Sequence, residues 1–302
     1  MDATKMTGVF CWIGIARRRP HFWVLLAFMA IRDPLRDKSP AFIRWIGGPW
    51  LRRRMRRAFF SIEISGLENL QSALELSKNS ESKTSASNFE LRTSNSSVIL
   101  YSNHCSWWDG FVDFTLAQLY HCDLHVMMDQ QNLDLNPFLR WMGAFGVNLE
   151  SSARAALALR TARRILETPS ASGGNRMLSL YGQGKMTSPH ERPLALRPGL
   201  TWLLENGPGC VALPMARRYE FMNEDRPQVF LRFGSPTRSH SLAELEILLE
   251  KELDALHPQL TRWPARDFTR VWQADLSLNK KWERWSRKWL GSDAKTFQPF
   301  NR

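Results

Sequence analysis

Apolar runs of strand length alternate with helical patterns along the middle of this chain, and this alternation most constrains its fold. The strand-like runs are VILYS, LHVMM, RMLSLY, CVALPMA and QVFLRF, which begin at residues 98, 124, 176, 210 and 228. The helical patterns between them are FVDFTLAQLY, ARAALALRTARRILE and GLTWLLENG. Buried strands that alternate with amphipathic helices are typical of α/β folds. We therefore expect a mixed central sheet flanked by helices, with amphipathic helical extensions at both ends.

Three regions of different composition divide the 302 residues. Residues 1–58 are basic and rich in Trp, residues 59–240 contain the α/β alternation, and residues 241–302 are expected to form a C-terminal helical extension. Within the central region, residues 72–97 are rich in Ser, Asn, Lys and Glu and have little to bury. This composition predicts a flexible insertion.

The basic charge is concentrated at one end of the chain. Residues 1–57 contain 13 Lys and Arg against 3 Asp and Glu, so they carry +10 of the formal net charge of +12. Such an excess favours an anionic partner, either nucleic acid or a membrane surface. Aromatic residues mixed with six arginines between Phe42 and Phe60 favour the membrane, and no nucleic-acid recognition module is recognisable. Core helices with solvated basic faces are the alternative.

No apolar run reaches the roughly 18 residues of a spanning helix, and the longest is His21 to Ile31. The sequence therefore predicts a protein that lies peripherally, or shallowly inserted, on the cytoplasmic face of a membrane. Four scattered cysteines without framework spacing agree with a reducing compartment.

The C-terminal tail contains a second aromatic and basic pattern. Trp282, Trp285 and Trp289 follow one another at helical spacing, with Lys281 directly before the first and Arg284 and Lys288 between them. An aromatic stripe with flanking cations fits a membrane-surface helix. Packing of the same stripe onto the domain is an equal alternative.

Candidate chemistry begins in the stretch SNHCSWWDG, which directly follows the strand-like run SVILY. His104 stands five positions before Asp109, a spacing that can return the carboxylate onto the imidazole across a strand-to-helix turn. A histidine held by a carboxylate can act as a general base, with the nucleophile supplied by the substrate. A pair that only caps a turn is the structural alternative. Cys105 adjoins the pair, but a covalent intermediate on it is not favoured.

The segment VILYSNHCSWWDG resembles the NHxSxxD block of the glycerolipid acyltransferase superfamily, the lysophosphatidate acyltransferase-like proteins. The lead-in SIEISGLENL, the segment MMDQQNLDLNPFLRWMGAFGVNLE, the segment LSLYGQGKM and the segment VALPMA resemble the neighbouring blocks in order and spacing. The resemblance extends from about residue 59 to residue 235, and it is best in the first and fourth blocks.

This resemblance implies a membrane-associated O-acyltransferase of lipid metabolism and phospholipid biosynthesis. His104 would deprotonate a lipid hydroxyl, Asp109 would orient the imidazole, and the acyl group would come from acyl-CoA or acyl-carrier protein as co-substrate. No bound cofactor and no metal is implied, and His121, Cys122 and His125 lack the second ligand pair of a zinc site. Backbone donors between Gly182 and Gly184 would face the acceptor or the oxyanion. The implied substrate-binding residues are Asn103, Ser106, Trp107, Trp108, Gln183, Gly184, Lys185 and Pro214.

Departures from the family pattern affect the acceptor. The second block ends at Leu149 and Glu150 where the family has an arginine, and the third block has Gln183 and Met186 where the family has Glu and Arg. Arginines of this kind suit phosphate because their fork donates two parallel bonds. Either Lys185 with Arg192 or Arg197 replaces them and the acceptor is a lysophospholipid, or the acceptor is a lipid alcohol or glycolipid without phosphate, which we slightly favour. A non-catalytic lipid-binding relative in a biosynthetic complex is the remaining alternative.

Overall fold

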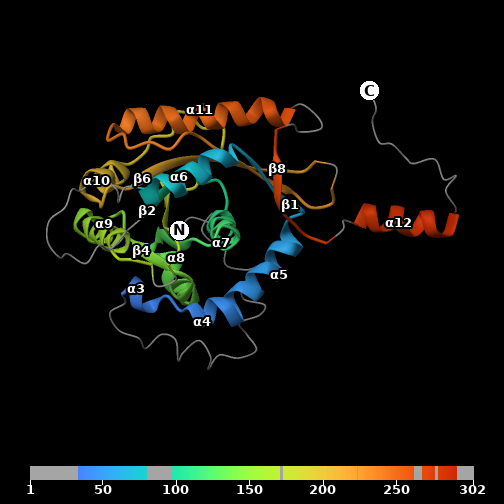
Figure 1. The fold of residues 1–302 in the computed structure, drawn as a ribbon, viewed down its shortest axis with the longest axis horizontal. Coiled ribbons are helices and arrows are strands. Elements are labelled where there is room, and N and C mark those ends of the chain that lie inside the picture. The colour runs from blue at the N-terminus through green and yellow to red at the C-terminus, as the bar shows by residue number, and fades with distance from the viewer. Residues whose placement is uncertain are drawn as a thin grey trace, which may run out of the picture.

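The computed structural model of the protein describes residues 33–79, 97–170, 173–222, 224–261, 267–275 and 278–290. Within them, eight strands form one sheet with the order β4-β3-β5-β2-β6-β7-β1-β8 (Figure 1). Neighbouring strands run parallel except for the antiparallel pairs β6–β7 and β1–β8. The strands are β1 Ser61–Ser65, β2 Ser97–Ser102, β3 Asp123–Asp129, β4 Ala144–Val147, β5 Arg176–Tyr181, β6 Val211–Glu220, β7 Gln228–Phe233 and β8 Thr269–Gln273.

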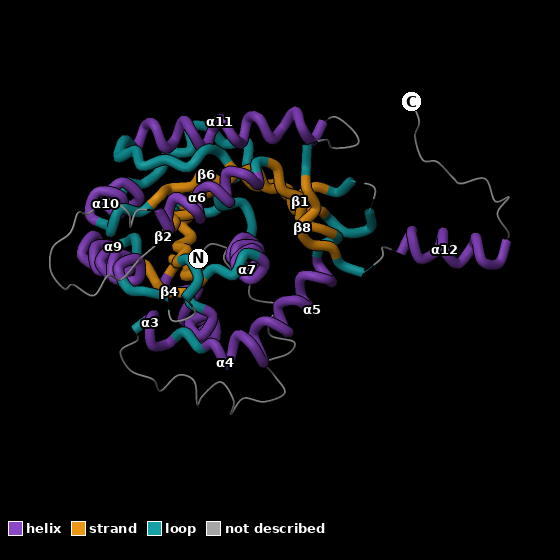
Figure 2. The backbone as a smooth tube through the Cα atoms, viewed as in Figure 1, coloured by secondary structure: helices purple, strands orange, loops and turns teal. Residues whose placement is uncertain are grey.

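Helices enclose this sheet, and Figure 2 shows them in purple around the orange strands. The longer α-helices are α5 Gly48–Ala58, α6 Leu67–Asn79, α7 Asp109–Leu119, α9 Ser152–Glu167, α10 Gly199–Asn206, α11 Leu242–Thr261 and α12 Leu278–Leu290. The short ones are α3 Pro34–Asp37, α4 Pro40–Phe42 and α8 Gln130–Leu135, with a π-helical turn η2 at Ile43–Gly47 and a 3-10 helix η3 at Pro137–Met142.

Alternate side chains of the central strands fill two apolar cores, one on each face of the sheet. On one face, Val98 and Leu100 of β2 pack with residues of α5, α6, α7 and η3. On the other face, Ile99 and Tyr101 of the same strand pack with residues of α9, α10 and α11. Because both faces are covered, the central strands are largely apolar, as the sequence indicated. The predicted mixed α/β sheet is confirmed.

Five strands coincide with the apolar runs of the sequence and β1 lies in the lead-in segment SIEISGLENL, whereas β4 and β8 were not expected. Strand β4 has only four residues, one of which is Gly146. Strand β8 pairs with β1 at the edge of the sheet and begins with the exposed residues Thr269 and Arg270. Neither strand shows a run of apolar residues long enough to stand out from a loop.

Some predicted boundaries differ from the structure. Residues 72–79, which the sequence assigned to a flexible insertion, continue helix α6, because Leu70 and Ala73 bury a face of that helix in the core. Helix α11 and strand β8 are parts of the α/β body, although residues 241–302 were expected to form an extension. Residues 80–96 and the apolar segment from His21 to Ile31 lie outside the described residues.

Helix α5 carries both apolar and basic faces. Its Leu51 and Met55 are buried in the core, whereas Arg52, Arg53, Arg56 and Arg57 extend outward. Among the described helices, none combines the length and the apolar composition that crossing a bilayer requires.

Candidate active site

The stretch SNHCSWWDG connects the central strand β2 to helix α7. Strand β2 ends at Ser102, which pairs with Tyr181 of β5 on one side and with Met215 of β6 on the other. Helix α7 begins at Asp109. The loop therefore lies at the carboxyl end of parallel strands, where open α/β sheets generally place their ligands.

The side chains of His104 and Asp109 are in contact. Nδ1 of His104 lies 2.7 Å from Oδ2 of Asp109. The same oxygen accepts the backbone N–H groups of Cys105, at 2.9 Å, and Ser106, at 3.1 Å. The side chain of Asp109 is fully buried, whereas that of His104 is 24% exposed. One carboxylate therefore holds both the loop and the imidazole, and the imidazole reaches solvent.

The environment of Asp109 favours its ionised form. Burial by itself raises the pKa of this carboxyl group, but the charge of Arg217 and hydrogen bonds from His104 and Tyr219 outweigh it and lower the pKa below its ordinary value. An ionised Asp109 accepts a proton-bearing Nδ1 of His104. Nε2 of the neutral imidazole is then the unprotonated nitrogen, which is the arrangement of a general base.

A buried ion-pair network contacts Asp109 and supports the pair. The sequence analysis did not predict this network. The fully buried Arg217 of β6 places Nη2 2.7 Å from Oδ1 of Asp113 and 2.9 Å from Oγ of Ser102. Its Nη1 lies 3.5 Å from Oδ1 of Asp109. A lone carboxylate in the apolar helix FVDFTLA and an arginine continuing the apolar strand VALPMA were the available sequence signals.

Two tyrosines complete the surroundings of the pair. Tyr219 donates its hydroxyl proton to Oδ1 of Asp109 over 2.5 Å. Tyr181 stacks on the imidazole of His104, with ring centroids 4.4 Å apart and 14° between the planes. The hydroxyl of Tyr181 donates to Oδ2 of Asp113 over 2.9 Å. His104 is thereby held through its ring face as well as through Nδ1.

A cavity of about 600 Å³ opens beside His104, a volume in the usual range of small-molecule sites. Most of its wall is apolar. Its apolar lining comes from α7 (Phe111, Phe114), β3 (Val126, Met127, Met128), η3 (Leu139, Met142), β4 (Ala144, Val147), α9 (Ala155, Leu159), β5 (Leu180) and α10 (Leu200). A hydrocarbon chain is the kind of ligand that such a wall accommodates.

The two tryptophans of the stretch have different positions. Trp107 lines the cavity and is 40% exposed. Trp108 packs against Phe59 and Phe111 in the core instead, and the guanidinium of Arg54 lies over its ring. The structure therefore brings Trp107, but not Trp108, to the cavity.

Four residues that were implied to bind substrate do not line the cavity. Their contacts lie within the loop and the sheet. Asn103 is buried and joins the backbone of Arg217 through two hydrogen bonds. Ser106 accepts the N–H of Trp108, and Pro214 lies within β6 opposite Tyr101 of β2. These three positions, and Gln183, support the site from outside the cavity.

Gln183 was implied to bind substrate, but its side chain has partners within the protein. It is buried, its Oε1 accepts the backbone N–H of His104 over 3.1 Å, and its Nε2 donates to Oγ1 of Thr187 over 2.6 Å. Both halves of the amide therefore have partners, and the side chain fixes the position of His104.

Gly184 and Lys185 line the cavity, as does Arg197. Gly184 has a φ of +69°, and a Cβ there would lie 2.6 Å from Nε of Arg197, so this turn requires glycine. Its N–H donates to the carbonyl of Tyr181 and is not available to an oxyanion, contrary to expectation. Arg192 pairs with Asp254 instead of lining the cavity.

Cys105 was considered as a nucleophile, and Cys122 and His125 as metal ligands, and their surroundings favour neither role. Burial and the charge of Asp109 raise the pKa of the Cys105 thiol to about 12, so this thiol is protonated at neutral pH. Cys122 donates to the carbonyl of Tyr120, and the buried His125 lies beside Arg176. Among the described residues, no three His, Cys, Asp or Glu side chains are grouped to hold a metal.

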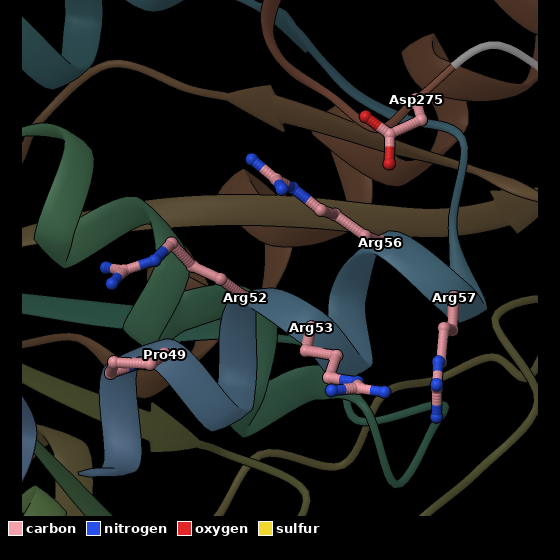
Figure 3. Close-up of a pocket in the computed structure, with 6 residues that line it drawn as sticks. All are labelled: Pro49, Arg52, Arg53, Arg56, Arg57 and Asp275. Carbon is pink, nitrogen blue, oxygen red and sulfur yellow. The ribbon is translucent and has the colours of Figure 1, made fainter. Parts of the chain in front are cut away.

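A second concavity, of about 430 Å³, lies on the outer side of α5 (Figure 3). It is lined by Pro49, Arg52, Arg53, Arg56, Arg57 and Asp275. Four guanidinium groups on one helix, with one carboxylate opposite, form a surface suited to phosphate groups. Asp275 stands three residues before α12, so this basic groove adjoins the start of the Trp-rich helix.

Comparisons with known proteins found matches among solved structures. No protein-family model matches the sequence, and no curated protein matches it. The chain is similar to the crystal structure of the 1-acyl-sn-glycerophosphate (LPA) acyltransferase PlsC from Thermotoga maritima. The TM-score is 0.42 with 14% sequence identity, over 84% of this chain and 94% of that chain.

Proposed function

We propose that this protein is an acyltransferase that moves a fatty acyl group from an acyl thioester to the hydroxyl of a lipid. One observation carries the proposal: His104, paired at 2.7 Å with an ionised Asp109, lines an apolar cavity of about 600 Å³. A general base thus borders a space that suits a hydrocarbon chain. The resemblance of VILYSNHCSWWDG to the acyltransferase block supports the same chemistry.

The proposed reaction uses the imidazole twice. Nε2 of His104 removes the proton of the acceptor hydroxyl, and Asp109 stabilises the resulting imidazolium. The alkoxide forms a bond to the thioester carbonyl carbon, and the carbon–sulfur bond breaks. The departing thiolate takes the proton from His104, so the products are a lipid ester and a free thiol. Cys105, as a neutral and partly buried thiol, has no part in this reaction.

Two classes of acceptor are compatible with the residues at and near the cavity. Lys185 and Arg197 both line it, so they, rather than Arg192, are the groups that would meet an acceptor phosphate. A lysophospholipid is therefore one acceptor class. A lipid alcohol or glycolipid is the other, because the arginines of the family pattern are absent at Glu150 and Met186.

We further propose that the protein works at an anionic membrane surface on the cytoplasmic side. The basic groove on α5 supports this proposal, because its four arginines complement lipid phosphates (Figure 3). The exposed tryptophans of α12 add aromatic groups of the kind that lie at the headgroup level. Both elements would bring the site to the layer that contains the acyl acceptor.

Untargeted lipid analysis of cells that lack the protein would identify the acceptor as a lipid that accumulates without its acyl chain. Purified protein would then be assayed for thiol release from palmitoyl-CoA and palmitoyl-acyl-carrier protein with that acceptor. We expect His104→Ala to reduce the rate more than about a thousandfold, and the exposed His240→Ala to leave it unchanged. Lipid binding without thiol release would instead identify a non-catalytic lipid-binding relative.

A further inference from the structure

We propose that Arg217 is a positioning residue that acts on the imidazole of His104 through a closed ring of side chains. The ring runs from His104 to Asp109, Arg217, Asp113 and Tyr181, and then back to His104. This inference rests on the proposed function, because it explains how the base of that reaction is held and charged.

Each link of the ring is a direct contact. His104 and Asp109 meet at 2.7 Å, Asp109 and Arg217 at 3.5 Å, and Arg217 and Asp113 at 2.7 Å. Asp113 accepts the hydroxyl of Tyr181 over 2.9 Å, and the Tyr181 ring stacks on His104 with centroids 4.4 Å apart. A displacement of Arg217 therefore reaches the imidazole from two sides, through Nδ1 and through the ring face.

Three secondary structure elements fix the ring. Arg217 projects from β6 toward α7, on the same side of the sheet as Met215 and Tyr219. Asp109 and Asp113 lie four residues apart on one side of α7, so a single guanidinium can meet both. Ser179 of β5 donates to Oδ2 of Asp113 over 2.5 Å and fixes that carboxylate further.

The net formal charge of the ring changes when His104 takes up a proton in the proposed reaction. Two carboxylates and one guanidinium leave a net charge of −1 while His104 is neutral. Protonation of His104 makes the whole ring neutral, so the single net negative charge of the other groups compensates the charge of the imidazolium. Without Arg217 the two carboxylates would leave −2, and the ring would bind a proton more tightly than a base should.

Of the other titratable groups near the pair, Tyr181, Tyr219 and Cys105 are neutral at physiological pH, whereas the cations Lys185 and Arg197 line the same cavity as His104. Burial is the main reason that the pKa values of Tyr181, Tyr219 and Cys105 are raised. Within the ring, Arg217 of β6 and Asp113 of α7 are therefore the two charges that act on the His104–Asp109 pair. Arg218, the next residue, points away from the ring and meets His190 and His257.

The test is an NMR titration of the His104 imidazole in the full-length protein, assigned by its loss in His104→Ala. Arg217→Gln removes the positive charge, and we expect the pKa of His104 to rise by at least about one unit, a tenfold tighter proton affinity. Asp113→Asn removes a negative charge on the other side of Arg217, so the same pKa should fall. Arg217→Lys keeps the charge and should stay within a few tenths of a unit of the wild type.

Arg232→Gln is the matched control, because it removes another arginine ion pair of the sheet, at 2.6 Å from Glu252, without touching the ring. We expect no change in the titration of His104 in this variant. Unchanged or same-direction titrations in Arg217→Gln and Asp113→Asn would overturn the proposal. If Arg217→Gln does not fold, the sign of the shift in Asp113→Asn still decides. Because the titration needs no substrate, its outcome is independent of whether acyl transfer is observed.

Discussion

The ring of Tyr181 lies almost parallel to the imidazole of His104, at 14° and with centroids 4.4 Å apart. Aromatic stacking of this kind stabilises an arrangement by about 0.5–1.5 kcal/mol beyond burial. Asp109 fixes only one ring nitrogen, so the imidazole could still turn about that hydrogen bond. Stacking on Tyr181 removes this freedom, and the base keeps a defined plane beside the cavity.

We predict that Tyr181→Phe retains most of the acyl-transfer rate, because phenylalanine preserves the stacked ring and loses only the hydroxyl bond to Asp113. Tyr181→Leu should lose roughly tenfold more than Tyr181→Phe, since the imidazole plane is no longer held. The measurement is kcat with the identified acceptor, after far-UV circular dichroism has shown that both variants fold. Equal rates in the two variants would mean that stacking does not orient the base.

Much of this site was predictable from local sequence, and the rest was not. The five-residue spacing of His104 and Asp109 across a strand-to-helix turn predicts their contact, because both ends of the turn are local. Arg217 and Asp113 come together from segments about one hundred residues apart, so no local pattern pairs them. The one available signal was a single charged residue within an otherwise apolar helix or strand, which in a folded chain generally has a buried partner.

The fold shows the same division between local and long-range information. The central strands were predictable because burial on both faces leaves long apolar runs. The edge strand β8 was not, because it is held by pairing with β1 and its first residues, Thr269 and Arg270, are exposed. Gln183 was predictable as a residue of the site, but its contact with the His104 backbone depends on how two loops meet.

Stability should decrease in acid through two carboxylates, the buried Asp109 and the partly buried Asp123. Burial alone would raise the pKa of Asp109 and of Asp123, but Arg217 lowers the pKa of the first, and Lys38 with Arg176 lowers that of the second, below the ordinary value of 3.8. A carboxyl with a lowered folded pKa stabilises the native state above its ordinary pKa. That contribution is lost as the pH falls through the folded pKa, because the unfolded chain takes up the proton first.

We therefore expect the free energy of unfolding, measured with urea, to fall progressively as the pH is lowered from about 5 to 2. Asp109→Asn should be less stable than the wild type at pH 7, with a smaller loss on acidification, because one of the two titrating groups is gone. The exposed Asp134→Asn is the control, and it should follow the wild-type curve. An Asp109→Asn curve parallel to the wild type would show that Asp109 does not contribute to the pH dependence.

The cavity predicts a limit on acyl-chain length that can be moved by substitution. Leu159 of α9 lines the cavity, so Leu159→Trp should fill part of it and shorten the acyl chain that is transferred best. Each methylene that loses its place in the cavity forfeits about 0.8 kcal/mol of burial. Competition among acyl-CoA donors of different length, with the products separated by mass, measures the preference.

The matched control for this prediction is Leu157→Trp on the same helix, because Leu157 is 62% exposed and does not line the cavity. We expect that variant to keep the wild-type preference. The same chain-length profile in Leu159→Trp and the wild type would mean that the hydrocarbon chain binds elsewhere.

The tryptophan stripe of α12 predicts vesicle binding that can be separated from catalysis. Trp282, Trp285 and Trp289 are 65%, 50% and 69% exposed, and in the sequence Lys281 directly precedes the first of them while Arg284 and Lys288 lie between them. Figure 1 shows α12 lying apart from the sheet and its covering helices, which agrees with the exposure of the three tryptophans. On an anionic membrane, each cation contributes about 1 kcal/mol and the indoles enter the headgroup layer.

Replacing the three tryptophans with serine should reduce flotation of the protein with phosphatidylserine-containing vesicles by tenfold or more, and the remaining binding should weaken further in high salt. A control that replaces Leu135, Phe221 and Ile247 with serine removes equally exposed apolar side chains elsewhere and should float like the wild type. Acyl transfer to a detergent-dispersed acceptor should be similar in both triple variants, since none of the six residues lines the cavity. Undiminished flotation of the tryptophan variant would assign membrane binding to the arginines of α5. Equal flotation of the wild type with phosphatidylserine-containing vesicles and with phosphatidylcholine alone would exclude a role for anionic lipid.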